Sequence, residues 1–129
     1  MSIPVGASHS ETTIVDASNL ASSLGSGLVD VFATPMMILL CENAASKCVA
    51  QYLDDGQATV GTHVDIEHSG ATPPGMRVTA DATVTAVDRR RIEFVVVVND
   101  EVGEVGRGTH VRFIIDKKKF TEKAIAKGR

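Results

Sequence analysis

The sequence predicts an α+β fold in which an antiparallel sheet of about five strands wraps around one long central helix. Two observations predict it: residues 34–53 read as a helix that is apolar on every side over its first two turns, and after Gly56 the hydrophobic period changes from 3.6 to 2. The chain has 129 residues, of which 43% are hydrophobic. This is enough for one buried core, so we expect a single domain over residues 1–129.

The first thirty residues contain one expected strand, residues 11–15, and a Ser- and Gly-rich stretch, residues 22–27, that is either a mobile lid or a loop. The helix begins at Thr34, a residue type that caps helices, and Pro35 suits the first helical position. Residues 54–56, Asp-Asp-Gly, end the helix.

Four strands are expected after the helix, at residues 58–68, 76–87, 92–99 and 104–116. Turn-forming residues separate them, and the short breaks predict an antiparallel meander. A helix that is apolar all round cannot lie on a surface, so the sheet must cover it, which is the arrangement of a hot-dog fold.

Composition removes several classes of function. The formal net charge is -3 and the chain has five aromatic residues and no Trp, which disfavours a nucleic-acid-binding protein. The N-terminus does not read as a secretory signal, and no apolar run approaches the roughly 20 residues of a membrane span. Cys41 and Cys48 lie roughly 10 Å apart along one helix, too far for a disulfide. We expect a cytoplasmic protein without nucleic-acid or membrane partners.

Glu42 is the most informative single position. On a helical wheel it shares its direction with apolar residues and points away from the polar stripe of Lys47 and Gln51. A carboxylate aimed at the interior either pairs with a backbone group or an Arg for structure, or has its pKa raised, as a catalytic base does.

His68 and Thr34 are the other two candidates. Alternation along residues 58–68 places His68 on the face with Val60, Thr62, Val64 and Ile66, toward the helix, where it is a satisfied core residue or a functional one. Thr34 is a simple cap or a hydroxyl at the positive end of the helix. Eight residues, roughly 12 Å, separate Thr34 from Glu42, so either the substrate extends between them or a second subunit supplies one of them.

Three further patterns have weaker implications. His63, Asp65 and Glu67 share one strand face, but alternation alone produces this, and we expect no metal site. Gly103, Gly106 and Gly108 follow a turn and lie in a strand, and they favour a bulge or a close backbone approach over a phosphate-binding loop. Residues 117–129 carry six basic side chains against one acidic, which suits a solvated terminal segment or a contact with the phosphates of a nucleotide-bearing substrate.

Over roughly residues 28–120 the chain resembles the fluoroacetyl-CoA thioesterase-like group of hot-dog proteins. The resemblance rests on the order and spacing of five pieces: Val31-Phe32-Ala33-Thr34, Glu42, Val60-Gly61-Thr62, His68 with Ala71-Thr72-Pro73-Pro74-Gly75, and Gly106-x-Gly108-Thr109-His110-x-Arg112.

This resemblance implies that Thr34, Glu42 and His68 form the catalytic set for acyl-CoA hydrolysis, that Gly61 and Arg112 bind substrate, and that a homodimer has its active sites at the subunit interface. It implies no cofactor. The fluoroacetyl-specific member has aromatic residues in a lid before the Thr, whereas residues 20–31 here contain none. We therefore expect a different small or medium acyl group.

The chemical route stays open at this stage. Free N–H groups at the helix N-terminus would stabilise the oxyanion of a thioester bound there. Thr34 or Glu42 would then attack directly, or Glu42 would activate water while His68 moves protons. The alternative functions are a non-catalytic acyl-CoA-binding hot-dog protein and, ranked lower, a hot-dog hydratase or dehydratase.

Overall fold

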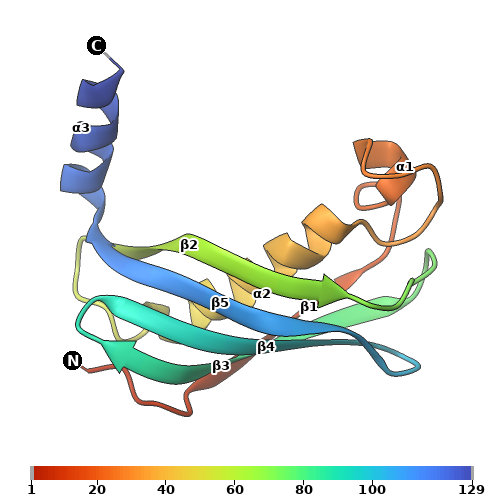
Figure 1. The fold of residues 1–129 in the computed structure, drawn as a ribbon, viewed down its shortest axis with the longest axis horizontal. Coiled ribbons are helices and arrows are strands. Elements are labelled where there is room, and N and C mark those ends of the chain that lie inside the picture. The colour runs from red at the N-terminus through yellow and green to blue at the C-terminus, as the bar shows by residue number, and fades with distance from the viewer. Residues whose placement is uncertain (1, 129) are drawn as a thin grey trace.

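The computed structural model describes residues 2–128 and contains one five-stranded sheet and three helices (Figure 1). In chain order the elements are β1 (Ser8–Ile14), α1 (Ala21–Leu24), α2 (Thr34–Ala50), β2 (Gln57–His68), β3 (Arg77–Asp88), β4 (Arg91–Asp100), β5 (Glu104–Asp116) and α3 (Lys117–Lys127). The expected helix and strands are all present, with boundaries that differ from the expected ones by at most three residues.

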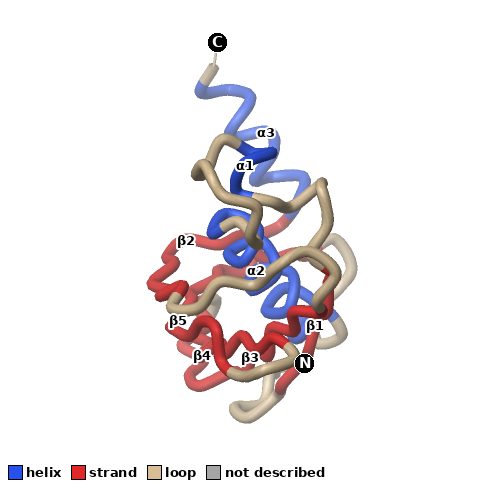
Figure 2. The backbone as a smooth tube through the Cα atoms, turned by 90° about the vertical axis from the view of Figure 1, so that its right-hand side faces the viewer, coloured by secondary structure: helices blue, strands red, loops and turns tan. Residues whose placement is uncertain are grey.

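The curled sheet covers one side of α2, and this contact forms the core (Figure 2). Seven side chains of α2 are buried, among them Met37, Cys41 and Val49. On β3 and β4 every second residue is buried, as in Val96 and Val98, because alternate side chains point to the concave face. The predicted hot-dog arrangement, a helix wrapped by an antiparallel sheet, is confirmed.

The expected four-strand meander is wrong in one respect. The strand order is β1-β3-β4-β5-β2, so only β3, β4 and β5 follow one another as neighbours, and β2 pairs with β5 at the edge. The segment between β2 and β3, residues 69–76, is too long for a tight hairpin and instead crosses the end of the sheet. Its buried Thr72 anchors it, because the Thr72 hydroxyl donates to Asp100 Oδ2 (2.9 Å) and the Thr72 carbonyl accepts from Phe32 N (2.9 Å).

A bulge in β2 changes which side chains face the helix. The register against β5 shifts between Gly61 and His63, and one extra residue reverses the alternation there. Thr59 is buried and Val60 only half-buried, so the inward face runs through Thr59 and Gly61 before the bulge and through Val64, Ile66 and His68 after it. The expectation that Val60 and Thr62 face inward and Gly61 outward is therefore wrong, while that for His68 is right.

Two glycines hold β5 close to its neighbours. A Cβ at Gly108 would lie 1.9 Å from the Asp65 carbonyl oxygen on β2, and a Cβ at Gly106 would lie 2.7 Å from Met37 Sδ on α2. This confirms the close backbone approach expected for Gly106 and Gly108. The same expectation is wrong for Gly103, which lies before β5 and where a Cβ would meet no heavy atom within 4 Å. No helix within residues 2–128 has the length and apolarity needed to cross a membrane.

Candidate active site

Thr34 and His68 meet at one end of the molecule. Thr34 is the first residue of α2 and His68 the last residue of β2, and their Oγ1 and Nδ1 atoms are 2.7 Å apart, within hydrogen-bond distance. Thr34 does not cap the helix: the N-cap is Ala33, and no side chain caps that end. The Thr34 hydroxyl is instead committed to the imidazole, an arrangement in which a base can activate a nucleophile.

His68 sits in a setting that favours a neutral imidazole. The side chain is half-buried, and this burial lowers its pKa from the ordinary value of 6.5. Its Nε2 atom is buried and has no hydrogen-bond partner within residues 2–128. A neutral ring with Nδ1 against Thr34 can accept the hydroxyl proton, and its buried Nε2 then carries the ring proton.

Thr34 and His68 both line a hollow of about 290 Å³. Its walls come from residues just before α2, including Phe32, from the crossing loop at Ser69 and Gly70, and from the segment that begins with α1, including Gly27 and Val29. The Ser- and Gly-rich stretch thus lies over the Thr34–His68 pair, the place that a lid would occupy.

The first turn of α2 leaves one backbone donor at this hollow. Pro35 has no N–H, and the N–H groups of Met36 and Met37 both donate to the Ala33 carbonyl (3.0 Å each). Among residues 2–128 the Thr34 N–H has no acceptor. The helix end therefore offers one free amide, together with its positive dipole, to an oxyanion.

Glu42 belongs to a second group, halfway along α2. Its Oε2 lies 3.4 Å from Arg112 Nη1, and its side chain is 37% exposed whereas that of Arg112 is 8% exposed. Arg112 is fixed by Thr59, because its Nε donates to Thr59 Oγ1 (2.8 Å) and its Nη2 to the Thr59 carbonyl (2.9 Å). Glu42 is therefore paired with an Arg, as expected if its role is structural. Part of its side chain nevertheless remains exposed to solvent.

Gly61 creates the space in which this carboxylate lies. A Cβ at Gly61 would lie 2.8 Å from Glu42 Oε2, 3.1 Å from His110 Cε1 and 3.2 Å from Arg112 Nη1. The two residues expected to bind substrate, Gly61 and Arg112, therefore both contact Glu42. The structure does not bring Glu42 to Thr34 or His68, in keeping with the eight residues between them on α2.

His110 is a member of this group that residue patterns did not single out. It is fully buried, its Nδ1 lies 2.7 Å from the His63 carbonyl oxygen, and its Nε2 lies 3.3 Å from Arg112 Nη1. The His63 contact requires Nδ1 to carry the proton, which leaves Nε2 to accept from Arg112. Burial lowers the pKa of His110 and keeps it neutral beside that guanidinium. The available signal was its spacing of two residues from Arg112, which puts both on one strand face.

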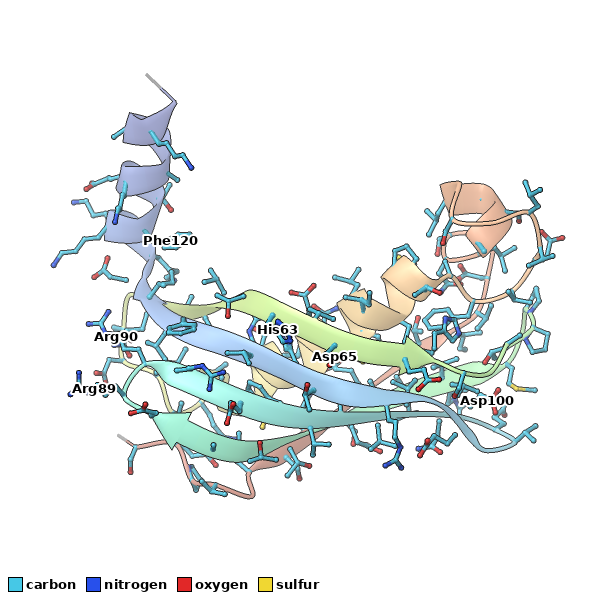
Figure 3. The ribbon with its side chains drawn as sticks, in the orientation of Figure 1. His63, Asp65, Arg89, Arg90, Asp100 and Phe120 are labelled. Atoms are coloured by element: carbon cyan, nitrogen blue, oxygen red, sulfur yellow. The ribbon has the colours of Figure 1, made fainter. Side chains whose placement is uncertain are left out.

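His63, Asp65 and Glu67, which share one strand face, are not grouped as metal ligands within residues 2–128. His63 and Asp65 lie along the middle of β2 (Figure 3). Within residues 2–128 no three His, Cys, Asp or Glu side chains are grouped as metal ligands.

The chain is similar to known thioesterases. The family model for fluoroacetyl-CoA-specific thioesterase matches residues 15–118. The fluoroacetyl-CoA thioesterase of Streptantibioticus cattleyicolor is 42% identical over 94 residues, which are 73% of this chain and 68% of that protein.

Solved structures agree. A fluoroacetyl-CoA thioesterase superposes with a TM-score of 0.93 at 33% identity over 98% of both chains. A thioesterase superfamily member from Thermus thermophilus superposes with a TM-score of 0.89 at 27% identity, over 97% of this chain and 93% of that one.

Proposed function

This chain belongs to the family of fluoroacetyl-CoA-specific thioesterases, and from that premise we infer that it is an enzyme that hydrolyses an acyl-CoA thioester to the free acid and CoA. We propose that Thr34, His68 and Glu42 carry out the reaction. The observation that carries this assignment is the 2.7 Å contact between Thr34 Oγ1 and His68 Nδ1 at the floor of the hollow.

The contact favours covalent catalysis by Thr34. Neutral His68 accepts the hydroxyl proton at Nδ1 while Thr34 Oγ1 forms a bond to the thioester carbonyl carbon. The Thr34 N–H and the helix dipole stabilise the resulting oxyanion. When the C–S bond breaks, His68 returns the proton to the CoA sulfur, and an acyl ester remains on Thr34. Water then attacks the carbonyl carbon of that ester and gives a proton to His68. The bond from this carbon to Thr34 Oγ1 breaks, His68 returns the proton to Oγ1, and the free acid leaves.

Glu42 needs a second subunit to take part in this reaction. β2 pairs only with β5, so one edge of a 12-residue strand is open, and its central residues 61–65 are exposed. We propose a homodimer in which two β2 strands pair antiparallel about a two-fold axis near His63. The other sheet edge, β1, is shorter, with seven residues, and carries the His9–Glu11 and Lys47–Glu11 ion pairs.

This pairing of subunits would place the Glu42 carboxylate of the partner subunit near the Thr34–His68 pair. Glu42 lies against Gly61, seven positions before His68 on its own β2. Gly61 and Asp65 are each two positions from His63, so Glu42 of the partner subunit would lie level with Asp65, three positions before His68. That is roughly 10 Å along the strand, which leaves room for the thioester and a water between the two groups. Glu42 of the partner subunit then orients the water that attacks the acyl ester, while His68 takes the proton of that water.

We propose a small or medium acyl group as the substrate. The hollow is lined by apolar and small residues, among them Ala21, Gly27, Val29 and Val31, and Phe32 is its only aromatic wall residue apart from His68. The free cysteines Cys41 and Cys48 and the CoA substrate suit a cytoplasmic location, which we also propose.

Trapping the acyl enzyme tests the route. A series of acyl-CoA substrates is mixed with the enzyme, quenched within milliseconds and digested, and the peptide containing Thr34 is examined by mass spectrometry while a thiol reagent measures CoA release. We expect CoA release and a peptide heavier by one acyl group. Binding of acyl-CoA without CoA release would assign the chain to the non-catalytic alternative. Hydrolysis that persists at the full rate in Thr34→Val would overturn the role of Thr34.

A further inference from the structure

α3 stands apart from the rest of the chain. It leaves the sheet at the end of β5 and projects beyond the edge formed by β2 (Figure 1). None of its residues is buried, Phe120 is 45% and Ile125 is 53% exposed, and none of its five lysines forms an ion pair within residues 2–128. An 11-residue helix is marginal in water by itself, so this one needs a surface to pack on.

A second exposed apolar surface lies at the opposite end of the same edge. There α1 and the loop that follows it also project past β2, and Leu28 is 98% and Val29 60% exposed. In the view turned by 90°, α1 and α3 overlap, so both lie at a similar position across the thickness of the molecule, although α3 extends farther from the sheet (Figure 2). The open edge of β2 lies between them.

The two-fold axis near His63 joins these surfaces. The Lys117 N–H donates to the Gly56 carbonyl (2.9 Å), which fixes the base of α3 beside Gly56. Gly56 lies seven positions before His63 and Gly70 seven positions after it, so Gly56 would face Gly70 of the partner subunit. Gly70 lines the hollow at Thr34 and His68. The 12 residues of β2, roughly 40 Å, separate α3 from the hollow of its own chain.

We propose that α3 reaches across the dimer, packs on the lid segment of the partner subunit (residues 22–31), and binds the phosphates of the CoA held there. This proposal rests on the thioesterase function and dimer argued above. Phe120 and Ile125 would cover Leu28 and Val29, which removes both apolar surfaces from water.

The positive charge at α3 indicates that its ligand is the phosphates of CoA. Arg90, Lys119 and Lys123, together with Phe120, line a hollow of about 200 Å³ at the base of α3, and its one acidic wall residue is Asp116 (Figure 3). The chain before residue 117 has seven basic and fifteen acidic side chains, so α3 is a cationic arm on an acidic body. The nucleotide end of CoA is polyanionic and lies at the far end of the pantetheine arm, outside the acyl pocket. Lysines bind such phosphates as point charges.

Calorimetric binding of CoA and of pantetheine tests the ligand. Lys119→Gln/Lys123→Gln is expected to weaken CoA binding roughly five- to tenfold and to leave pantetheine binding as it was. The matched control, Lys47→Gln/Arg77→Gln, removes the same charge on the β1 and β3 side of the sheet, away from β2, and is expected to bind both ligands as the natural chain does. Equal CoA affinity in all three proteins, or preferential binding of RNA or of anionic vesicles by α3, would overturn the proposal. Because no turnover is measured, failure of the thioesterase function would not imitate either result.

A mixed dimer tests the crossing. One subunit carries Thr34→Ala with natural lysines, and the other carries Lys119→Gln/Lys123→Gln with a natural Thr34. If α3 acts on the partner, the one working site receives natural lysines, and KM for acyl-CoA returns to that of the natural dimer. If α3 acts within its own subunit, KM stays as high as in the Lys119→Gln/Lys123→Gln dimer, which would overturn the crossing.

Discussion

Replacing Gly61 by Ala should impair catalysis far more than folding. The added methyl group would lie 2.8 Å from Glu42 Oε2, whereas ordinary contacts begin near 3.4 Å, so the carboxylate must retreat by about 0.6 Å. Glu42 can do this because Oε2 is the far end of a flexible and partly exposed side chain. His110 Cε1 and Arg112 Nη1, at 3.1 and 3.2 Å, need to yield only a few tenths of an ångström.

The expected effects on folding stability and on catalysis differ in size. Gly61 does not have a positive φ, so Ala fits its backbone, and the lower entropy of the unfolded chain offsets part of the local strain. We expect the free energy of unfolding to change by less than about 1 kcal/mol. Displacement of a catalytic group by a substantial fraction of an ångström lowers kcat by roughly tenfold to a hundredfold.

Steady-state kinetics and urea denaturation on the same preparation provide the assay. Gly103→Ala is the matched control, because a Cβ there has no heavy atom within 4 Å and φ is not positive. It should match the natural enzyme in both measurements. An unchanged kcat in Gly61→Ala would refute the link between the Gly61 space and the working position of Glu42. Loss of folding would refute the claim that the Glu42 side chain moves aside for the added methyl group.

Four more outcomes follow from the site. Thr34→Val should lower kcat/KM at least a hundredfold while Thr34→Ser keeps most of it, as measured by CoA release, because only the hydroxyl reacts. The acid limb of kcat/KM should lie below pH 6.5 and vanish in His68→Gln: burial lowers the His68 pKa, so the imidazole stays unprotonated until the pH falls below that of a free histidine. Arg112→Lys should destabilise the fold by about 2 kcal/mol in urea titrations, since an ammonium group cannot reproduce the fork that binds Thr59 and Glu42. A thiol reagent should react slowly with the native protein and with two thiols after denaturation, because burial, and then the Glu42 charge, raises the pKa of Cys41 to about 12, and burial raises that of Cys48.

Local patterns were sufficient for most of the fold. Period and turn chemistry located α2 and the four strands after it, because a buried face leaves its repeat in the sequence. They did not give the position of β2, since pairing with β5 rather than β3 is a long-range choice that no local repeat records. They also missed the bulge at Gly61, because one extra residue looks the same as continued alternation.

For the site, too, local patterns indicate individual residues but not the tertiary contacts between them. Thr34, Glu42 and His68 were selected as polar groups at inward or helix-end positions, and the Thr34–His68 contact joins two of them. The capping role of Thr34 failed because β2 ends beside α2 and offers an imidazole, a tertiary contact that propensity cannot anticipate. The role of His110 does not follow from the sequence pattern, because it depends on the tautomer fixed by the His63 carbonyl across the sheet.

The segment over the hollow and the pair beneath it are subject to different constraints. Thr34 and His68 are held by α2 and β2, whereas between Ala21 and Phe32 every residue is exposed or half-exposed. Substitutions there cost little folding free energy within one subunit, because no contact buried inside that subunit is lost. Mutation can therefore reshape the wall that meets the acyl chain and leave the reacting groups in place. Divergence of substrate preference within this family would be expected to concentrate in this short stretch.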